Sequence, residues 1–170
     1  MIIIRKATES DLHDMLTIYN DVIKNTTAVY EYKPHTFQMR KQWFAAKNES
    51  GFPVFCAEEN GAIGFSSIGP FRNWAAYKYS VENSMYVSAE QRGKGIGKLL
   101  LLPLIEAAKQ MNMHTIIASI DATNESSLRL HKSLGFIEVA HFKQVGYKFG
   151  RWLDLKFLQM ILDTPLQPVE

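Results

Sequence analysis

The amino-acid sequence predicts an α/β fold in which a mixed β-sheet is flanked by layers of helices. Segments with strand character alternate with helical segments in the order strand, two helices, three strands, helix, strand, helix, two strands. The 170 residues contain no linker, repeat or low-complexity segment, so we expect a single domain over residues 1–170. Hydrophobic residues make up 46% of the chain and charged residues 21%, which is typical of a globular protein with a substantial core.

The N-terminal part is predicted to hold one strand and two helices. Ile2–Arg5 has strand character, and Thr8–Asp11 resembles a helix start with an acid in the first turn. Apolar residues then recur at helical spacing until about Asn25. Thr26–Pro34 is irregular and aromatic, and a second helix is expected after Thr36.

Three strands are predicted next. Val54–Glu58 and Ala62–Gly69 flank Asn60-Gly61, a dipeptide typical of hairpin turns. Pro70–Tyr79 is an aromatic-rich loop, and the strand Val81–Val87 follows it. An apolar helix is expected at Leu99–Met111 and a strand at Thr115–Ile120. A short helix should begin at Asn124 or Glu125 and run to Leu134, with Gly135 as its left-handed cap. The last two strands are expected at Phe136–Phe142 and Trp152–Ile161, followed by a frayed tail at Asp163–Glu170.

Charge, cysteine content and the N-terminus exclude several classes of protein. The net charge of only +2 does not indicate a nucleic-acid-binding surface. Cys56 is the single cysteine, so it excludes an internal disulfide, and in its apolar strand we expect it to be inert core packing. The apolar run within Met1–Lys6 is too short for a signal peptide or a membrane span, which favours a cytoplasmic protein. The histidines share no metal-ligand spacing, so no metal site is predicted.

The most informative segment is the glycine-rich run Gln91–Lys98, which lies between a strand and an apolar helix. Gly93, Gly95 and Gly97 leave backbone N–H groups able to point at one anion, and the helix dipole and neighbouring cations add positive charge. The run lacks the Ser or Thr that follows the lysine of a Walker loop and the third glycine of a dinucleotide-binding motif. We interpret it as a loop for the pyrophosphate of a nucleotide-like cofactor, the alternative being a flexible basic turn that merely starts a helix.

The pattern that does fit is Arg-x-x-Gly-x-Gly, at Arg92, Gly95 and Gly97, which resembles the acetyl-CoA pyrophosphate loop of the GNAT acetyltransferases. The element order also resembles the GNAT fold. Four further motifs are similar to those of the phosphinothricin and methionine sulfoximine N-acetyltransferases, namely Glu82-x-x-x-Tyr86-Val87, Asn124-x-x-Ser127-x-x-Leu130-His131, Leu134-Gly135-Phe136 and the block Val145–Asp154. The resemblance covers the chain from Ile2 to about Gln159.

This resemblance implies an N-acetyltransferase that transfers acetyl from acetyl-CoA to the α-amine of a small amino-acid analogue. The implied acceptors are phosphinothricin, methionine sulfoximine and methionine sulfone, with antibiotic or herbicide resistance as a consequence. It also implies a homodimer, for which the aromatic residues of Val145–Asp154 would suit a twofold contact, the alternative being that they pack inside one subunit. The alternatives are an acetyltransferase for another small amine or a protein N-terminus, and a non-catalytic acyl-CoA-binding module.

Two residues are candidates for proton transfer. The resemblance places the catalytic glutamate of the family at Glu82, which would take the proton of the ammonium group directly or through a water. A solvent-facing glutamate is the alternative. His131 stands where the wider superfamily usually has a tyrosine that protonates the departing thiolate, and the phosphinothricin-type subfamily also has histidine there. Either it is that proton donor or it is a packed helix histidine.

The resemblance also implies the residues that bind the cofactor. Backbone groups of Met85, Tyr86 and Val87 would bind the pantetheine arm like an added strand. Asn124 would contact the same arm in addition to capping its helix. The loop residues expected at the pyrophosphate are Arg92, Gly93, Lys94, Gly95, Ile96, Gly97 and Lys98.

Three residues are candidates for the acceptor site. Arg72 could hold an amino-acid carboxylate in a two-pronged fashion, as the resemblance suggests, unless it is an ordinary surface arginine. Tyr30 and Tyr77 lie in irregular aromatic segments that could wall a small pocket, although such residues are as often lids of the core.

Overall fold

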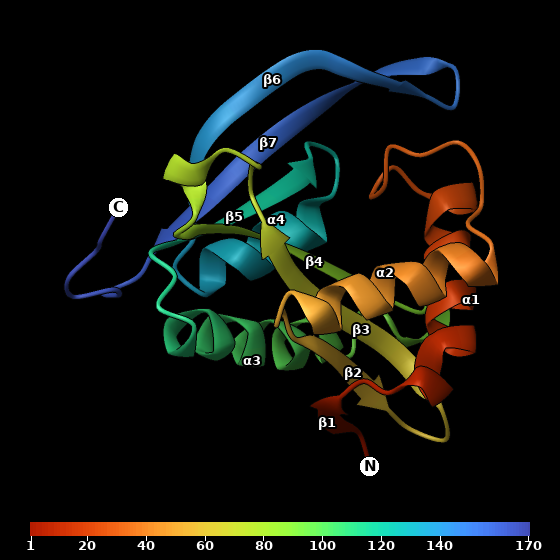
Figure 1. Ribbon diagram of the computed structural model, residues 1–170. Helices are drawn as coiled ribbons and strands as arrows, with labels where there is room; N and C mark the ends of the chain where they lie inside the picture. Colours follow the sequence, from red (N-terminus) through yellow and green to blue (C-terminus); the bar gives the residue numbers. More distant parts are fainter. The chain divides into compact units, whose positions relative to one another are not determined.

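Seven strands form a single mixed sheet in the order β1-β2-β3-β4-β5-β7-β6 in the computed structural model, which describes residues 1–170 (Figure 1). The pairing of β4 with β5 is parallel, whereas β1–β2, β2–β3, β5–β7 and β7–β6 are antiparallel. The strands are β1 Ile3–Lys6, β2 Val54–Glu58, β3 Ala62–Pro70, β4 Ser80–Val87, β5 Thr115–Asp121, β6 Ile137–Lys148 and β7 Arg151–Ile161. The helices are α1 Leu12–Asn25, α2 Phe37–Glu49, α3 Ile96–Gln110 and α4 Glu125–Ser133. The α/β prediction and its order of elements are therefore confirmed.

The chain divides into two compact units. The first consists of Met1–Ile68 and Ser84–Leu104, and the second of Gly69–Asn83 and Ile105–Glu170. Because the boundaries fall inside β3, β4 and α3, each of these elements contributes residues to both units.

The core of the first unit is built by its helices and its antiparallel strands. One buried cluster joins α1, α2, β2 and β3 through Leu12, Met15, Ile18, Phe44, Val54 and Phe65. A second cluster is formed by Ala57, Ile96 and Leu100, with Met85 and Val87 packed against it. This second cluster fixes the first turn of α3 and the last residues of β4 on the same support, which positions the glycine-rich loop between them.

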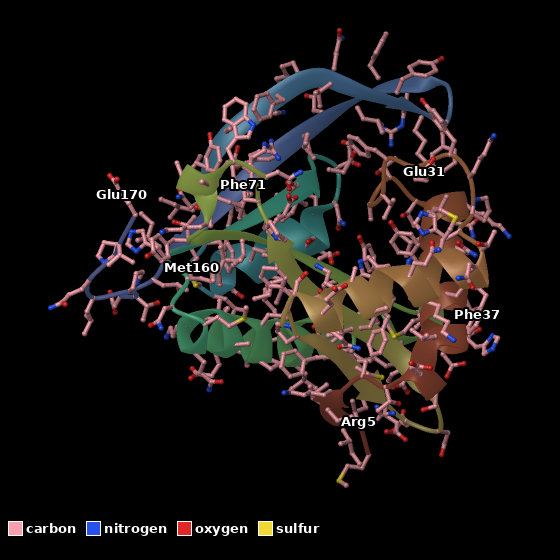
Figure 2. The ribbon with its side chains drawn as sticks, in the orientation of Figure 1. Arg5, Glu31, Phe37, Phe71, Met160 and Glu170 are labelled. Carbon is pink, nitrogen blue, oxygen red and sulfur yellow. The ribbon has the colours of Figure 1, made fainter.

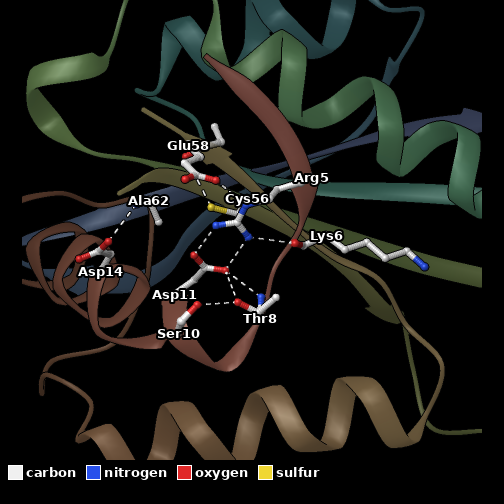
Figure 3. A network of polar contacts seen from close by, with 10 residues as sticks. Arg5, Lys6, Thr8, Ser10, Asp11, Asp14, Cys56, Glu58 and Ala62 are labelled. Atoms are coloured by element: carbon white, nitrogen blue, oxygen red, sulfur yellow. Dashed lines mark hydrogen bonds and ion pairs between the residues drawn. The ribbon is translucent and has the colours of Figure 1, made fainter. Parts of the chain in front are cut away.

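A polar network anchors the N-terminal strand of the first unit (Figure 3). Both terminal nitrogens of Arg5 donate to the carboxylate of Asp11 at 2.8 Å, and its Nε donates to Glu58 at 2.5 Å. The same Asp11 carboxylate accepts a hydrogen bond from the backbone N–H of Thr8 at 2.7 Å, which caps the short turn Glu9–Asp11 ahead of α1. The Arg5 guanidinium lowers the pKa of Asp11, which is only 5% exposed.

Cys56 is completely buried beside this network. Burial raises the pKa of its thiol to about 12, so almost no thiolate forms near neutral pH. The prediction of inert core packing is confirmed.

The second unit is dominated by β5 and by the long hairpin of β6 and β7 (Figure 1). The sequence-based prediction ended β6 at Phe142, which was wrong, because the strand continues to Lys148 across an irregularity. Gln144 has a positive φ of 53°, and its backbone N–H donates to Asp154 on β7 at 2.9 Å. This side-chain acceptor on the opposite strand holds the bulged backbone, a relationship that hydrophobic periodicity does not reveal.

Other boundaries shifted by a few residues. The predicted helix Leu99–Met111 was placed too late, since α3 begins at Ile96, where the apolar pattern is not yet established. The tail beyond Ile161 makes several hydrogen bonds, including Thr164 Oγ1 to the Met113 carbonyl and the Val169 N–H to the Tyr79 hydroxyl at 2.9 Å. Fraying of the tail stays a prediction. None of the four helices has both the length and the apolar character that crossing a bilayer requires.

Candidate active site

The glycine-rich loop in the first unit has the backbone of an anion-binding nest. Gly93 and Gly95 adopt positive φ values of 78° and 80°, a backbone conformation that residues with a Cβ atom rarely adopt. The N–H groups of residues 93–97 have no backbone acceptor, and the first backbone hydrogen bonds beyond them run from Lys98 and Leu99 to the Gly95 carbonyl. These five N–H groups precede and open α3, so they lie at the positive end of its dipole. Such an arrangement binds phosphate groups.

The cations of the loop are only partly free. The Nε of Arg92 donates to the Val87 carbonyl at 3.1 Å, and its guanidinium lies 3.5 Å from the Asp21 carboxylate of α1. Lys94 donates to Gln91 at 2.8 Å. Arg92 therefore ties the loop to the end of β4 and to α1, and Asp21 is a partner that the sequence analysis did not identify.

The last residues of β4 approach β3 closely in the first unit. A Cβ added to Gly64 would meet the Tyr86 carbonyl at 3.0 Å and a methyl group of Leu100 at 3.1 Å. The Ser88 N–H donates to the Ile63 carbonyl at 2.9 Å. Glycine at position 64 thus allows the backbone of Met85–Val87, the predicted pantetheine-binding segment, to lie against β3.

Glu82 lies in the second unit, on the part of β4 that pairs with β5. It is half-buried and stands opposite Ile117 in the parallel register. Ser119, two residues further along β5, donates its hydroxyl to Glu82 Oε1 at 2.5 Å. This hydrogen bond fixes the orientation of the Glu82 carboxylate. Ser119 was not identified from the sequence, because the register between two parallel strands cannot be deduced from either strand alone.

His131 is buried in the second unit and both of its ring nitrogens are engaged. Nδ1 lies 2.8 Å from the Ser127 carbonyl, which can only accept, so this nitrogen carries the proton of the neutral ring. Nε2 lies 3.0 Å from the Asn83 amide nitrogen, which donates to it. Burial lowers the pKa of His131, which is 3% exposed. This geometry favours the packed helix histidine over the proton donor, and Asn83 is a further partner missed from the sequence.

Asn124 is the N-cap of α4, as predicted. Its side-chain oxygen accepts a hydrogen bond from the Ser127 N–H at 3.2 Å. The helix is closed by Gly135, whose φ of 97° confirms the predicted left-handed cap. These two residues fix the length of the helix that carries His131.

The predicted acceptor residues divide between the two units. Arg72 is exposed, donates to the Phe71 carbonyl at 3.0 Å and lies 4.3 Å from the Phe71 ring. The Tyr77 ring packs edge-on against the same ring at a centroid distance of 5.7 Å, so Phe71, labelled in Figure 2, brings Arg72 and Tyr77 together. Tyr30 belongs to the first unit and is 37% exposed. No three His, Cys, Asp or Glu side chains are grouped so that they could hold a metal ion.

A half-buried glutamate on the parallel strand of a mixed sheet is followed by a glycine-rich loop with free N–H groups ahead of a helix, an arrangement suited to an enzyme that uses a phosphate-bearing cofactor. Residues 4–156 match the family of acetyltransferase (GNAT) domains. The chain is 40% identical over 166 residues to the L-amino acid N-acyltransferase MnaT of Escherichia coli, covering 97% of this chain and 96% of that protein. It is 42% identical over 162 residues, or 94% of each chain, to the L-methionine sulfoximine/L-methionine sulfone acetyltransferase of Pseudomonas paraeruginosa.

A solved structure agrees with this assignment. The GNAT superfamily phosphinothricin acetyltransferase of Sinorhizobium meliloti, in complex with acetyl-CoA, superposes with a TM-score of 0.94 at 35% identity, covering 98% of this chain and 92% of that one. The chain therefore belongs to the GNAT acetyltransferase family, and the predicted fold and enzyme class are confirmed.

Proposed function

We propose that this enzyme transfers the acetyl group of acetyl-CoA to the α-amine of a small amino-acid analogue, namely methionine sulfoximine, methionine sulfone or phosphinothricin. The observation that carries the proposal is the course of β4, which holds Glu82 and then leads into five unpaired backbone N–H groups at the start of α3. The high identity to a methionine sulfoximine/sulfone acetyltransferase over 94% of each chain supports the acceptor class.

Glu82 is the proposed base. The acceptor ammonium transfers one proton to the Glu82 carboxylate, directly or through a water, and the free amine attacks the thioester carbonyl. The carbon–sulfur bond breaks, and the products are the N-acetyl acceptor, CoA thiol and one proton released to solvent. Ser119 keeps the carboxylate in one orientation during this transfer, since its hydroxyl holds Oε1.

The loop and the adjoining strand are the proposed site for acetyl-CoA. Backbone groups of Met85–Val87 bind the pantetheine arm, Asn124 contacts the same arm, and the N–H groups of residues 93–97 bind the pyrophosphate. Arg92 braces this loop through the Val87 carbonyl and Asp21. His131 is proposed to maintain the fold of α4 against β4, which its buried hydrogen bonds support.

The acceptor is proposed to bind through Arg72, with Tyr30 and Tyr77 as aromatic walls. Arg72 is exposed and positively charged, so it is available to an amino-acid carboxylate. We further propose that the chain acts as one domain, in the cytoplasm, as a homodimer. Acetylation removes the positive charge of the amine, so an amino-acid analogue no longer resembles an amino acid, which would provide resistance to it.

The decisive experiment measures CoA thiol release over a panel of amines. Methionine sulfone, methionine sulfoximine and phosphinothricin should be acetylated, while a polyamine and an alanine-terminated peptide should react far more slowly. Preference for the peptide or the polyamine would support the alternative acceptor classes. Acetyl-CoA binding by calorimetry without turnover on any amine would indicate a non-catalytic acyl-CoA-binding module. Arg72→Ala should raise the acceptor KM much more than the acetyl-CoA KM, and equal effects would contradict the proposed carboxylate contact.

A further inference from the structure

The loop between α1 and α2, residues 26–36, contains neither helix nor strand and belongs wholly to the first unit (Figure 1). It carries Tyr30 and Tyr32, which are 37% and 68% exposed. Fixing one backbone conformation costs entropy at every residue, so a segment of this length keeps its shape only where other groups hold it. The groups that hold the loop therefore determine where Tyr30 stands.

Both ends of the loop are tied to α1. At the first end, the Thr26 hydroxyl donates to the Val22 carbonyl at 2.8 Å and accepts a hydrogen bond from the Ala28 N–H at 3.1 Å. At the second end, the side-chain amide of Asn20 donates to the His35 carbonyl at 2.9 Å, and its oxygen accepts from the His35 N–H at 2.8 Å. The amide thus pairs with both backbone groups of one residue, much as a neighbouring strand would.

The second end depends on Asn20. Neither the N–H nor the carbonyl of His35 has a backbone partner, and both residues are half-buried. A donor and an acceptor on one short planar group are what an asparagine amide supplies. Replacing Asn20 with an apolar residue would leave both backbone groups of His35 without these partners, which is unfavourable wherever water does not reach them.

An aromatic ring connects the same end of the loop to β4. The Tyr19 ring centre lies 4.8 Å from that of His35 and 5.1 Å from that of Tyr86. The guanidinium of Arg40, which is 2% exposed, lies 4.1 Å from the Tyr19 ring centre and packs this ring against α2. Tyr86 belongs to Met85–Val87, the segment proposed to bind the pantetheine arm. The loop is therefore anchored one ring away from that segment.

We propose that Asn20 is a positioning residue for the acceptor amine. Its two hydrogen bonds hold residues 26–36 in one conformation, so that Tyr30 is in place before the acceptor binds. Without them the loop would sample further conformations, and only a fraction of the molecules would be competent to bind the acceptor. This role rests on the proposed function, in which Tyr30 lines the acceptor site. Asn20 acts through the loop and takes no part in the chemistry.

Steady-state kinetics of Asn20→Ala test the role. The KM for the acceptor should rise roughly tenfold, as expected for the loss of two hydrogen bonds, while the KM for acetyl-CoA and the kcat at saturating acceptor stay close to the wild-type values. Asn20→Asp keeps the size of the side chain but turns an oxygen towards the His35 carbonyl, so it should also raise the acceptor KM. Asn48→Ala removes an exposed amide from α2 and should match the wild type. An unchanged acceptor KM in both Asn20 variants, or an equal rise in both KM values, would overturn the proposal.

Hydrogen exchange covers the case in which the Asn20 variants fold poorly, because it begins with the wild type. The His35 N–H of the wild type should be protected from exchange. In Asn20→Ala, the amides of residues 26–36 should exchange faster, whereas those in the middle of α1 should keep their wild-type rates. A His35 N–H that exchanges in the wild type as fast as in an unstructured peptide would overturn the proposal without any variant.

The proposed function can fail separately. The kinetics use whichever amine the wild type acetylates fastest, so a preference for an amine other than methionine sulfone would count against the proposed acceptor class, and the KM of that amine would still decide the role of Asn20. Tyr30→Ala tests the wall itself. A raised acceptor KM in Tyr30→Ala beside an unchanged one in Asn20→Ala would overturn the role of Asn20 and leave the acceptor site as proposed.

Discussion

The amide of Asn83 donates to Nε2 of His131 at 3.0 Å, while Nδ1 of the same ring donates to the Ser127 carbonyl at 2.8 Å. The two partners define the tautomer, with the proton on Nδ1 and the lone pair of Nε2 already used. Burial also lowers the pKa of His131, which favours the neutral ring, and both ring nitrogens already have partners within the fold.

Replacement of His131 should therefore affect stability more than catalysis. We expect His131→Ala to lower the Tm clearly but to lower kcat by less than about tenfold, because a thiolate can leave without full protonation.

Glu82→Gln should lower kcat by about 10²–10⁴-fold at neutral pH, which is the usual contribution of a positioned base. The activity of this variant should partly return at high pH, where free amine is abundant. Steady-state kinetics with thermal unfolding would test this. A loss of kcat in His131→Ala as large as in Glu82→Gln, with an unchanged Tm, would identify His131 as the proton donor.

Ser119 should influence the rate through Glu82. Ser119→Ala frees the Glu82 carboxylate to rotate, so we expect kcat to fall while the KM for acetyl-CoA stays constant. Ser119→Thr keeps the hydroxyl and should restore most of the rate. Thr115→Val removes a hydroxyl four residues away on the same strand and serves as the control. Equal rates for Ser119→Ala and the wild type would show that the 2.5 Å hydrogen bond has no role in the reaction.

Gly95 should be required for cofactor binding because it leaves space for the pyrophosphate, and not only because it tolerates a positive φ. Gly95 and Gly51 have similar positive φ values, 80° and 73°, and a Cβ added at either position would meet no atom within 4 Å. Gly95→Leu and Gly51→Leu should thus lose similar stability, on the order of 1–2 kcal/mol. Only Gly95→Leu should weaken acetyl-CoA binding sharply, because its side chain would occupy the approach of the pyrophosphate. Calorimetry would measure the acetyl-CoA affinity of both variants. Equal affinities for Gly95→Leu and Gly51→Leu would argue against the loop as the pyrophosphate site.

The ion pair of Arg5 and Asp11 should make stability depend on pH. The pKa of Asp11 is lowered in the folded protein, so its contribution is complete above the unfolded pKa of about 3.9 and is lost as the pH falls through the folded value. Asp11→Asn should reduce the free energy of unfolding by roughly 1.5–3 kcal/mol at pH 7, and the difference from wild type should shrink below about pH 4. Urea denaturation at pH 7, 5 and 3 would measure the difference in unfolding free energy between the wild type and Asp11→Asn. Glu125→Gln, in an exposed pair, should change little at any pH, and a gap for Asp11→Asn that is constant with pH would contradict the argument.

The β6–β7 hairpin should mediate dimer formation. Val145, Tyr147, Phe149 and Trp152 are between 48% and 60% exposed, an unusual density of apolar side chains on one hairpin. Light scattering should give about twice the chain mass of 19.4 kDa. Trp152→Lys should shift the protein towards the monomer, whereas Trp74→Lys, at a similarly exposed tryptophan outside the hairpin, should not. A monomeric wild type at working concentration would exclude the dimer.

Features that depend on neighbouring residues in the chain could be predicted from the sequence. The turn at Asn60-Gly61 has the expected positive φ values of 58° and 119°, and the caps Asn124 and Gly135 occupy their predicted positions. The glycine-rich loop was recognised for the same reason, since glycine permits backbone conformations that other residues rarely adopt. Each of these features arises from interactions within a few residues, so the local sequence is sufficient to specify it.

The tertiary structure alone decided which distant groups meet. The parallel register of β4 and β5 brings Ser119 to Glu82, and the packing of α4 brings His131 to Asn83. The extension of β6 depends on Asp154 from the opposite strand, and the burial of Arg40 results from the rings that three separate elements place around it. The sequence determines that these side chains exist and on which elements they stand. Their partners are set by strand register and helix packing, which depend on the burial of the whole core and not on any short segment.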